Sequence, residues 1–551
     1  MTDGPPPPPG IALAATFTTD ALAAAMTRLL AEPAREVRTA PYGQTVEPLL
    51  DPAGVLLTHT GVNILLLRPE DLHRGAPGPS AGDRLLGELL AALTAVPARS
   101  AATWLIALPP PSPAALADPA TARWTDAAVR RVTDTVTRLP GMHLVPLDGL
   151  ADDYDVPDVH DEYADRIAHL PYTDEYFDAL ADRLVRLAAT TWNKPRKVVV
   201  LDCDNTLWTG VCGEDGPLGV RIGPDRRRVQ EFMLDQRARG RLLCLCSRND
   251  EADVHAVFTS NPDMALTLAD VTAYRIGWQP KAHYLRELSD ELGLALDSFV
   301  FVDDDAVECA SVRAQLPGVA VVELPRDPDA APRRLLREPA FDQLTVTDED
   351  RLRADSYAAE PGRRALRDSV ADYEEFLARC AIDVTMADLT DSALERAAQL
   401  TVRTTQFNLS GATRTVPDLR RLLDTGGRGW TVRVRDMFGD YGTTGLVLAE
   451  KHGDVLDVPV FLLSCRVLNR RVETRMLRLL SREALAAGCR TVRLPYRPTR
   501  RNAPARDFLE HVRGKPVGAE DPPGAVDVRA EDWARTPEPP PPAPPTHQQP
   551  T

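Results

Sequence analysis

The sequence predicts a multidomain α/β protein. Short runs that are apolar on both faces alternate with amphipathic helical segments, a pattern typical of strands buried in parallel sheets with helices between them. The clearest runs are Gly61–Leu67, Thr103–Leu108, Lys197–Leu201, Leu242–Cys246 and Phe299–Val302. At 551 residues the chain is too long for one hydrophobic core, and about 150 residues per domain suggests three or four domains.

Helical patterns over 226–239 and 283–292 separate the middle strands, as expected for βαβ units. The last third differs because its strands and helices are less regularly mixed. Strands are expected near Trp430–Val434, Leu446–Glu450 and Val458–Leu463, followed by a long amphipathic helix from Val472 to Ala487. This part is therefore predicted to be α+β.

Changes in composition predict the domain boundaries. The proline-rich ends, 1–10 and 521–551, are expected to be disordered tails, and 108–121 and 323–337 to be surface loops or linkers. The domains between them are predicted over 11–190, 195–330 and 340–520.

Composition excludes several classes of function. The formal net charge of -16 argues against general binding to nucleic acid, which needs a basic surface. The eight cysteines form no CxxC pair, so a zinc site or disulfide framework is not expected and a reducing cytoplasm fits better. Neither a signal peptide nor an apolar run long enough to span a membrane is present, which also favours the cytoplasm.

Acidic residues follow the buried strand in KVVVLDCDNTLW. Asp202 and Asp204 come directly after this strand, and functional groups of open α/β sheets collect at the carboxyl ends of strands. A carboxylate at Asp202 could attack phosphorus and bind Mg²⁺, while Asp204 could protonate the leaving oxygen and is also predicted as a metal ligand. Thr206 adds a hydroxyl in the following turn. Alone, the DxDxT pattern could equally be an acidic turn after a strand.

Three further segments complete a phosphoryl-transfer pattern. Ser247 ends a second strand, where its hydroxyl could hold a phosphoryl oxygen, and Lys281 begins a helix as a fixed positive charge. Asp303 and Asp304 follow a third strand and offer the hard oxygen ligands that suit Mg²⁺. Singly, Lys281 could be a surface lysine and the acidic run a polar turn. Together, and in this order, they predict a magnesium-dependent phosphoryl-transfer site.

These motifs resemble subfamily IIIC of the haloacid-dehalogenase (HAD) superfamily, and specifically the FkbH-like proteins of polyketide biosynthesis. The resemblance runs through DCDNTLW, GVCGEDG, CSRND, NPDMALTL and DSFVFVDDD, and continues in RTTQFNLSG, FGDYG and SCRVL. Two departures are visible. The chain has Asp303-Asp304-Asp305-Ala306 where Asp-Asp-Asn-Pro is expected, and Arg248-Asn249 where Lys-Asn is expected.

The resemblance implies an unusual reaction. FkbH-like proteins take the three-carbon acyl group of 1,3-bisphosphoglycerate, remove phosphate, and load a glyceryl thioester onto an acyl carrier protein. A cysteine relay is chemically reasonable because an acyl phosphate is activated toward a thiol. Cys203, between the two acidic residues, is the first candidate, and Cys212 and Cys465 are the alternatives. Any of the three could instead be a small buried thiol.

The flanking regions resemble two other domains of such proteins. Residues 340–515 resemble a GNAT-type acyltransferase domain, in which Arg466, Asn469, Arg470 and Arg471 would form a phosphate-binding loop before a helix. Asn469 replaces the expected glycine. The same stretch is rich in arginine, which would attract an acidic carrier protein, although these arginines could simply be solvated.

Residues 1–190 resemble a degenerate SGNH-hydrolase-like domain, because Thr16-Phe17-Thr18 stands where the nucleophilic serine is expected. Asp158 and His160 lie where an acid and a base could be, but they would have no serine to activate. We expect this domain to be structural or to dock a partner.

Two other functions remain open at this point: a plain small-molecule phosphatase, and a carrier-protein scaffold whose site is no longer active. The complete acidic, serine and lysine set speaks against the scaffold. A thioester product on a carrier protein would separate the glyceryl transferase from the phosphatase.

Overall fold

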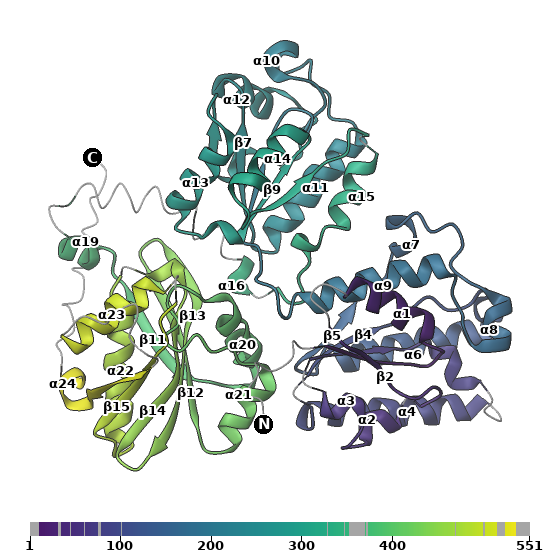
Figure 1. The fold of residues 1–551 in the computed structure, drawn as a ribbon, viewed down its shortest axis with the longest axis horizontal. Helices are drawn as coiled ribbons and strands as arrows, with labels where there is room; N and C mark the ends of the chain where they lie inside the picture. Colours follow the sequence, from purple (N-terminus) through teal and green to yellow (C-terminus); the bar gives the residue numbers. More distant parts are fainter. Residues whose placement is uncertain are drawn as a thin grey trace, which may run out of the picture. The chain divides into compact units, whose positions relative to one another are not determined.

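The computed structural model describes residues 10–30, 35–44, 46–59, 61–74, 79–100, 102–327, 329–346, 348–351, 357, 370, 373–468, 470–499, 502–514 and 524–535 (Figure 1). These residues divide into two compact units. The first lies within 1–193, 333–344 and 415–418, and the second within 194–332, 345–414 and 419–551.

The first unit contains a five-stranded parallel sheet in the order β2-β1-β3-β4-β5. Its strands are β1 (Ile11–Ala15), β2 (Val37–Thr39), β3 (Val62–Leu66), β4 (Thr103–Ala107) and β5 (Met142–Val145). Its helices are α1 (Asp20–Leu29), α2 (Glu47–Leu50), α3 (Val55–Thr58), α4 (Pro79–Ala95), α5 (Pro113–Ala117), α6 (Pro119–Val136), α7 (Leu150–Asp153), α8 (Glu162–Ala168), α9 (Asp174–Ala189) and α15 (Ala330–Leu336), the last running from one unit into the other. Helices cover both faces of the sheet (Figure 1).

Two hydrophobic cores explain why these strands are apolar on both faces. Alternate residues of a strand point to opposite sides of the sheet. Leu13 and Ile64 accordingly pack with α1 and α9, whereas Ala12 and Leu65 pack with α4 and α6. The sequence runs predicted as buried parallel strands at 61–67 and 103–108 are thus confirmed as β3 and β4.

The loop predicted over 108–121 is wrong. Pro113 and Pro119 each lie in the first turn of a helix, where the missing N–H of proline costs no hydrogen bond. Ser112 and Asp118 cap these helices by accepting hydrogen bonds from backbone N–H groups. The prolines therefore start α5 and α6. The linker predicted over 323–337 likewise contains a helix, α15.

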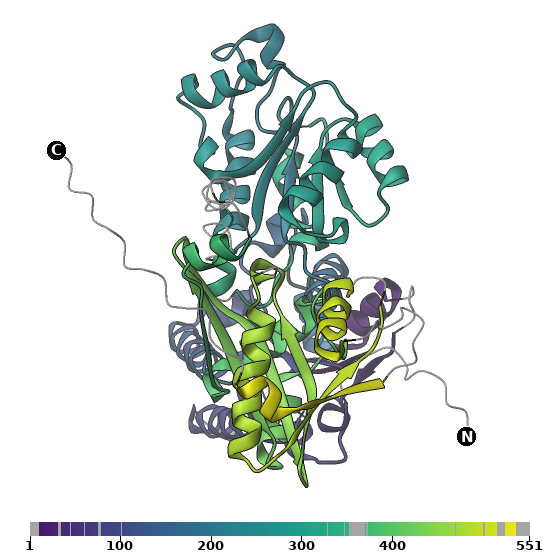
Figure 2. The same cartoon turned by 90° about the vertical axis from the view of Figure 1, so that its left-hand side faces the viewer.

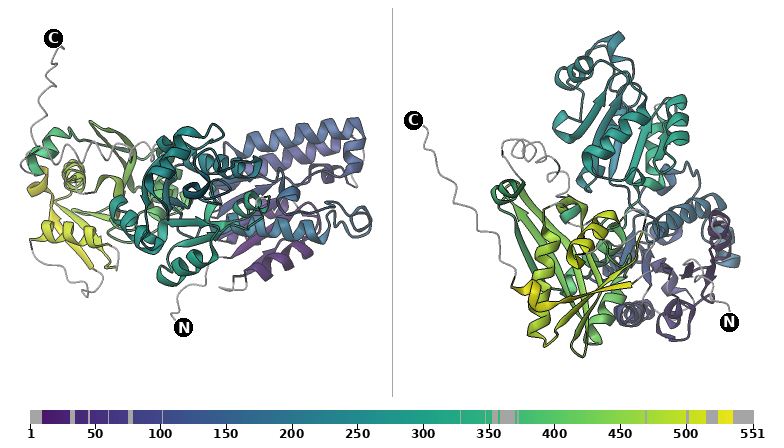
Figure 3. Two further views of the ribbon diagram at one scale, coloured as in Figure 1. Left: turned by 90° about the horizontal axis from the view of Figure 1, so that it is seen from above. Right: turned by 60° about the vertical axis from the view of Figure 1, so that its left-hand side comes forward.

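The second unit begins with another five-stranded parallel sheet, in the order β10-β9-β6-β7-β8. Its strands are β6 (Val198–Leu201), β7 (Leu242–Ser247), β8 (Val271–Ile276), β9 (Phe299–Asp303) and β10 (Ala320–Glu323). Its helices are α10 (Cys212–Asp215), α11 (Pro224–Ala238), α12 (Glu251–Ser260), α13 (Lys281–Leu292) and α14 (Ala306–Gln315). Figure 3 shows helices on both sides of this sheet, drawn in teal.

The second sheet of this unit is mixed and six-stranded, in the order β11-β12-β13-β14-β15-β16, with only β14 and β15 parallel. Its strands are β11 (Asp383–Asp388), β12 (Arg428–Asp436), β13 (Gly439–His452), β14 (Val455–Leu463), β15 (Thr491–Tyr496) and β16 (Gly524–Arg529). Its helices are α16 (Asp348–Arg351), α19 (Tyr373–Arg379), α20 (Leu394–Arg403), α21 (Val416–Asp424), α22 (Val472–Ala486), α23 (Ala503–Arg513) and α24 (Ala530–Ala534). Figure 2 shows the long helix α22 lying along this sheet.

The tail predicted to begin at 521 is placed too early. β16 pairs with β15, and the side chains of Val528 and Ala530 are buried in the core of the mixed sheet. Residues 521–523 and 536–551 lie outside the described residues, as do 1–9. In the described part of the chain, no helix is both long and apolar enough to cross a membrane.

Candidate phosphoryl-transfer site

Three carboxylates meet at the carboxyl edge of the β6–β9 pair. Asp202 follows β6, while Asp303 ends β9 and is followed by Asp304. One oxygen from each of these residues lies within 4.8 Å of the others. The topology explains this arrangement, because β6 and β9 are parallel neighbours whose carboxyl ends share one edge of the sheet.

Lys281 provides the positive charge of this group. Its Nζ donates hydrogen bonds to Asp202 Oδ1 at 2.6 Å and to Asp303 Oδ2 at 2.5 Å. Lys281 is the first residue of α13, and its side chain is 4% exposed. The lysine is therefore a buried site residue. The sequence alone left open whether it was a surface residue.

Burial and mutual repulsion act on the acidic groups. Burial raises the pKa of Asp202 to about 7, with Lys281 opposing the shift and Asp303 adding to it. Burial also raises the pKa of Asp303 and of Asp304, and the charge of Asp202 adds to the shift at Asp304. Three facing carboxylates with one lysine form a site in which a divalent cation would relieve the repulsion.

Asp204 is held by a separate set of donors. Its Oδ1 accepts hydrogen bonds from Trp208 Nε1 at 2.8 Å and from the backbone N–H of Cys212 at 3.0 Å. Its Oδ2 accepts one from Asn249 Nδ2 at 2.9 Å, and the same amide lies 3.0 Å from Ser247 Oγ. The network fixes the Asp204 carboxylate beside Ser247.

This network corrects the predicted metal ligands. Asp204 was expected to bind the metal through its side chain, but its carboxylate is not part of the three-carboxylate cluster. Instead, its oxygens face Trp208, the backbone N–H of Cys212 and Asn249. The arrangement suits a carboxyl group that exchanges a proton with a substrate better than a side-chain metal ligand.

Two residues of the site were missed in the sequence. Trp208 is buried and orients Asp204, while Arg226 of α11 is 3% exposed and its positive charge acts on Asp304. The Nε of Arg226 is buried without a hydrogen-bond partner. The sequence could not single out Arg226, because it is one of three consecutive arginines, 226–228, in the charged helix α11.

The geometry does not favour Cys203 as a relay thiol. Its side chain is fully buried, and burial raises its pKa well above the usual value, so the thiolate form is suppressed. Cys212 is also buried, with a pKa raised to about 12 mainly by burial. Among the eight cysteines, only Cys465 is partly exposed.

In the predicted phosphate-binding loop before α22, Arg470 contacts other side chains of the protein. The guanidinium of Arg470 pairs with fully buried Asp436 at 3.1 Å and lies 4.7 Å from the ring centre of Tyr441. Arg466 is 8% exposed, and Asn469 lies outside the described residues. Of the three predicted residues that are described, Arg471 is exposed. Arg470 therefore pairs with a buried acid instead of standing free to bind phosphate.

Residues 407–409 occupy the edge of β14. β14 and β15 pair only between 455–457 and 491–493. Beyond that point, Leu409 N donates to Phe461 O at 3.1 Å, and Leu463 N donates to Phe407 O at 2.9 Å. Arg497 N donates to Leu409 O at 2.9 Å. The chain's own segment therefore fills the edge that an extended ligand could otherwise use.

At Thr16 the described residues place a carboxylate and a backbone N–H, not a histidine, against the hydroxyl. The Thr16 hydroxyl donates to Asp71 at 2.8 Å and accepts from the backbone N–H of Arg68 at 3.0 Å. Asp158 offers its backbone oxygen to Thr173, and His160 forms an isolated bridge with Tyr172. The expectations of an SGNH-like fold and of a structural or docking role for this unit stay predictions.

No protein-family profile matches the chain, and no curated protein matches its sequence. Among solved structures, the N-terminal part of BF1531 from Bacteroides fragilis, described as containing a phosphatase domain complexed with Mg, has 22% identity and a TM-score of 0.54. The match covers 61% of this chain and 94% of that one. At this identity the likeness shows a shared fold.

Two other matches are weaker. The HAD family enzyme bt-2542 from Bacteroides thetaiotaomicron has 11% identity and a TM-score of 0.19, covering 24% of this chain and 95% of its own. A spermidine N-acetyltransferase chimera from Vibrio cholerae and hSSAT has 10% identity and a TM-score of 0.21, covering 28% and 99%. At these TM-scores they carry no argument.

Proposed function

We propose that the chain is a magnesium-dependent phosphatase of the HAD type that acts on a phosphorylated small molecule. The observation that carries this proposal is the cluster of Asp202, Asp303 and Asp304 around Lys281, with ligand oxygens within 4.8 Å of one another. Hard carboxylate oxygens at this spacing fit Mg²⁺. The shared fold with a protein described as containing a phosphatase domain supports it.

The residues have complementary roles in this proposal. A carboxylate oxygen of Asp202 attacks phosphorus, the bond to the leaving oxygen breaks, and Asp204 gives that oxygen a proton. A water then attacks the aspartyl phosphate, Asp204 takes the proton, and Asp202 is regenerated. Lys281 holds Asp202 in place and, with Ser247, faces the phosphoryl oxygens. Bound magnesium would offset the negative charge that develops on the phosphoryl group.

The activity is tested by phosphate release from acetyl phosphate and from p-nitrophenyl phosphate, with magnesium and with EDTA. The proposal requires release that depends on magnesium. Release that is equal in EDTA would contradict it.

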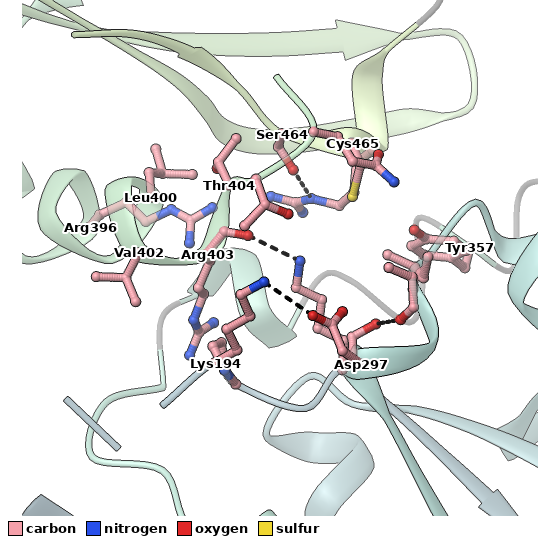
Figure 4. Close-up of a pocket in the computed structure, with 18 residues that line it drawn as sticks. Lys194, Asp297, Tyr357, Arg396, Leu400, Val402, Arg403, Thr404, Ser464 and Cys465 are labelled. Atoms are coloured by element: carbon pink, nitrogen blue, oxygen red, sulfur yellow. Dashed lines mark hydrogen bonds and ion pairs between the residues drawn. The ribbon is translucent and has the colours of Figure 1, made fainter. Parts of the chain in front are cut away.

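The finer proposal is that the substrate is 1,3-bisphosphoglycerate and that the glyceryl group passes to an acyl carrier protein as a thioester. Its support is the run of FkbH-like motifs from DCDNTLW to SCRVL, together with additional units beyond the phosphoryl-transfer sheet. Cys203 and Cys212 are buried, and Cys465 lines a pocket (Figure 4) with Lys197 and Ser298, which precede β6 and β9, at the sheet edge opposite the three carboxylates, so none of the three cysteines is assigned as the relay. Residues 407–409 occupy the edge of β14, so the prosthetic arm of a carrier protein could not bind along that edge.

Carrier loading can be measured by intact-protein mass spectrometry after incubation with a system that generates 1,3-bisphosphoglycerate. Arg471 directly precedes α22 and Arg482 lies within it, and both are exposed. Their joint change to Glu should weaken loading at low salt and leave phosphate release unchanged. Arg470 is unsuitable for this test because it pairs with buried Asp436.

The matched control is Arg130→Glu with Arg138→Glu, which reverses two exposed charges on the first unit. Equal loading by the wild type and the α22 variant would remove the docking role. No mass increase on any carrier, with phosphate still released, would leave the plain phosphatase.

A further inference from the structure

The exposed apolar side chains around the phosphoryl-transfer sheet lie at the edge that carries the site. Between residues 194 and 332, the large apolar side chains that are exposed in the described part are Leu218, Trp278 and Val307, at 71%, 67% and 76%. They lie in the segment from β6 to α11, in the loop between β8 and α13, and in the first turn of α14. Segments that lead from a parallel strand into the next helix lie at the carboxyl edge of the sheet. All three side chains therefore share the edge of Asp202.

Trp278 belongs to a short loop that joins two parts of the site. It follows β8 and precedes Lys281 by three residues. The backbone N–H of Gly277 donates to the backbone oxygen of Ser247 at 3.0 Å. The indole Nε1 donates to Asp250 Oδ1 at 3.4 Å, in the segment that follows Ser247. The indole thus lies against the segment that carries Ser247 and is close in sequence to Lys281.

Tyr284 of α13 holds this loop in place. Its hydroxyl oxygen accepts a hydrogen bond from the backbone N–H of Gln279 at 3.1 Å. A Cβ atom at Gly277 would lie 2.5 Å from the same oxygen, so the loop passes too close to Tyr284 for a side chain at that position. Since the backbone and the indole N–H both have fixed partners, Trp278 presents a preorganised aromatic surface beside the site.

An exposed indole is the unusual feature of this edge. Tryptophan is highly buried on average, because its large apolar surface gains free energy when it leaves water. Among the Phe, Tyr and Trp side chains described between 194 and 332, only Trp278 is exposed. Small-molecule sites combine a few polar groups with aromatic walls. The carboxylates, Ser247 and Lys281 supply the polar groups here, and Trp278 supplies an aromatic wall.

We propose that Trp278 is a specificity-determining residue, and that it packs against the organic group that bears the phosphate. The substrate class is then a phosphate ester whose organic group has an apolar face. This inference rests on the proposed phosphatase activity and not on transfer of a glyceryl group. An apolar contact contributes to binding in proportion to the area that it covers, so the effect of Trp278 should grow with the size of that group.

Steady-state kinetics with a large and a small organic group test the contact. In Trp278→Ala, the KM for p-nitrophenyl phosphate should rise about tenfold and kcat should stay within about twofold, because a binding contact is lost. The KM for acetyl phosphate should change by less than about twofold. Trp278→Phe keeps a ring without the hydrogen bond to Asp250 and should restore most of the KM. The matched control is Tyr163→Ala, which removes a 65% exposed aromatic side chain from α8 and should change neither KM.

The two proposals fail in different ways in this experiment. Phosphate release from acetyl phosphate with an equal KM for p-nitrophenyl phosphate in the wild type and Trp278→Ala would overturn the inference and leave the phosphatase. An equal loss with both substrates would also overturn it, because Trp278 would then only hold the loop. Absence of magnesium-dependent release from both substrates in the wild type would contradict the phosphatase proposal instead.

A binding measurement decides the inference without turnover. Phenylphosphonate has a carbon–phosphorus bond in place of the ester, so phosphate is not released from it. Quenching of Trp278 fluorescence by acrylamide is obtained as the difference between the wild type and Trp278→Phe, since the chain has seven tryptophans. Phenylphosphonate with magnesium should reduce this quenching in a saturable way, and methylphosphonate should have little effect. No reduction, or an equal reduction by both phosphonates, would contradict the contact.

Discussion

The chain contains two five-stranded parallel sheets, and charged and polar side chains lie near the carboxyl ends of the strands in both. The two groups of side chains are paired differently. In the first unit, Arg68 donates to Asp71 at 2.9 Å and to Asp165 at 2.7 Å, and Asp71 also accepts from Thr16 and faces His169. In the second, Lys281 donates to Asp202 and Asp303, and the charge of Arg226 acts on Asp304.

The difference shows what separates a structural cluster from a reactive one. Arg68 is 2% exposed, its charge is matched by acids, and the acids have partners of their own. At the other sheet the oxygens of three carboxylates lie within 4.8 Å of one another, and among the described residues only this group has the spacing of a metal site. The same strand-end position therefore predicts function when several carboxylates converge, and not when the acids are arranged around a buried arginine.

The largest expected effect is at Asp202. Asp202→Asn should reduce phosphate release on the order of 10³-fold or more, because an amide is a poor nucleophile and a weak magnesium ligand. The matched change in the other sheet, Asp71→Asn, should leave phosphate release unchanged. Steady-state kinetics of both purified variants measure this contrast. More than a tenth of wild-type turnover in Asp202→Asn would refute the assignment of the site.

The second prediction separates the two kinds of acid within the site. Asp304→Asn should weaken magnesium binding about tenfold or more, since it removes one of three carboxylate ligands. Asp204→Asn should leave magnesium affinity unchanged and lower kcat, because its carboxylate stands outside the metal cluster. Calorimetric titration with magnesium measures the affinities. Equal loss of affinity in both variants would return Asp204 to the metal ligands.

The third prediction concerns stability of the first unit. Asp71→Asn leaves the buried Arg68 charge without one of its partners, which should lower the free energy of unfolding by about 3 kcal/mol. Asp165 remains to pair with Arg68, so folding should survive. Chemical denaturation followed by circular dichroism provides the value. No destabilisation would mean that the cluster is not the structural element described.

The smallest effect is expected for Thr16→Ala. It removes one buried hydrogen bond to Asp71 and should cost about 1 kcal/mol of stability. Hydrolysis of p-nitrophenyl acetate by the full chain should be absent before and after the change. An esterase activity that disappears in Thr16→Ala would show that this unit is catalytic after all.

Local sequence was enough to predict the buried strands and the ends that carry the site. Runs such as 197–201 and 299–302 are apolar on both faces, and the acidic residues that follow them meet because the strands are parallel neighbours. The helix predicted over 472–487 is found as Val472–Ala486 for a similar reason, since its apolar period is long and regular.

Contacts between residues that are far apart in the sequence could not be predicted. Arg470 was predicted to bind phosphate, but it pairs with Asp436, which lies 34 residues earlier in the sequence. No local sequence pattern predicts that pairing. Cys203 was the first relay candidate because it lies between the two acidic residues, and the alternative of a small buried thiol could be decided only from the packing of the whole sheet. The prolines at 113 and 119 were interpreted as loop formers although they begin helices.

The central claim is that Asp202 attacks phosphorus. The most direct test is to mix the protein with magnesium and radiolabelled acetyl phosphate, quench in acid within the first turnover, and map the label by peptide mass spectrometry. The account predicts an acid-stable, base-labile phosphate on the peptide that contains Asp202, absent in Asp202→Asn and increased in Asp204→Asn, where hydrolysis of the intermediate is slowed. Rapid phosphate release with no label on that peptide at any time would contradict it.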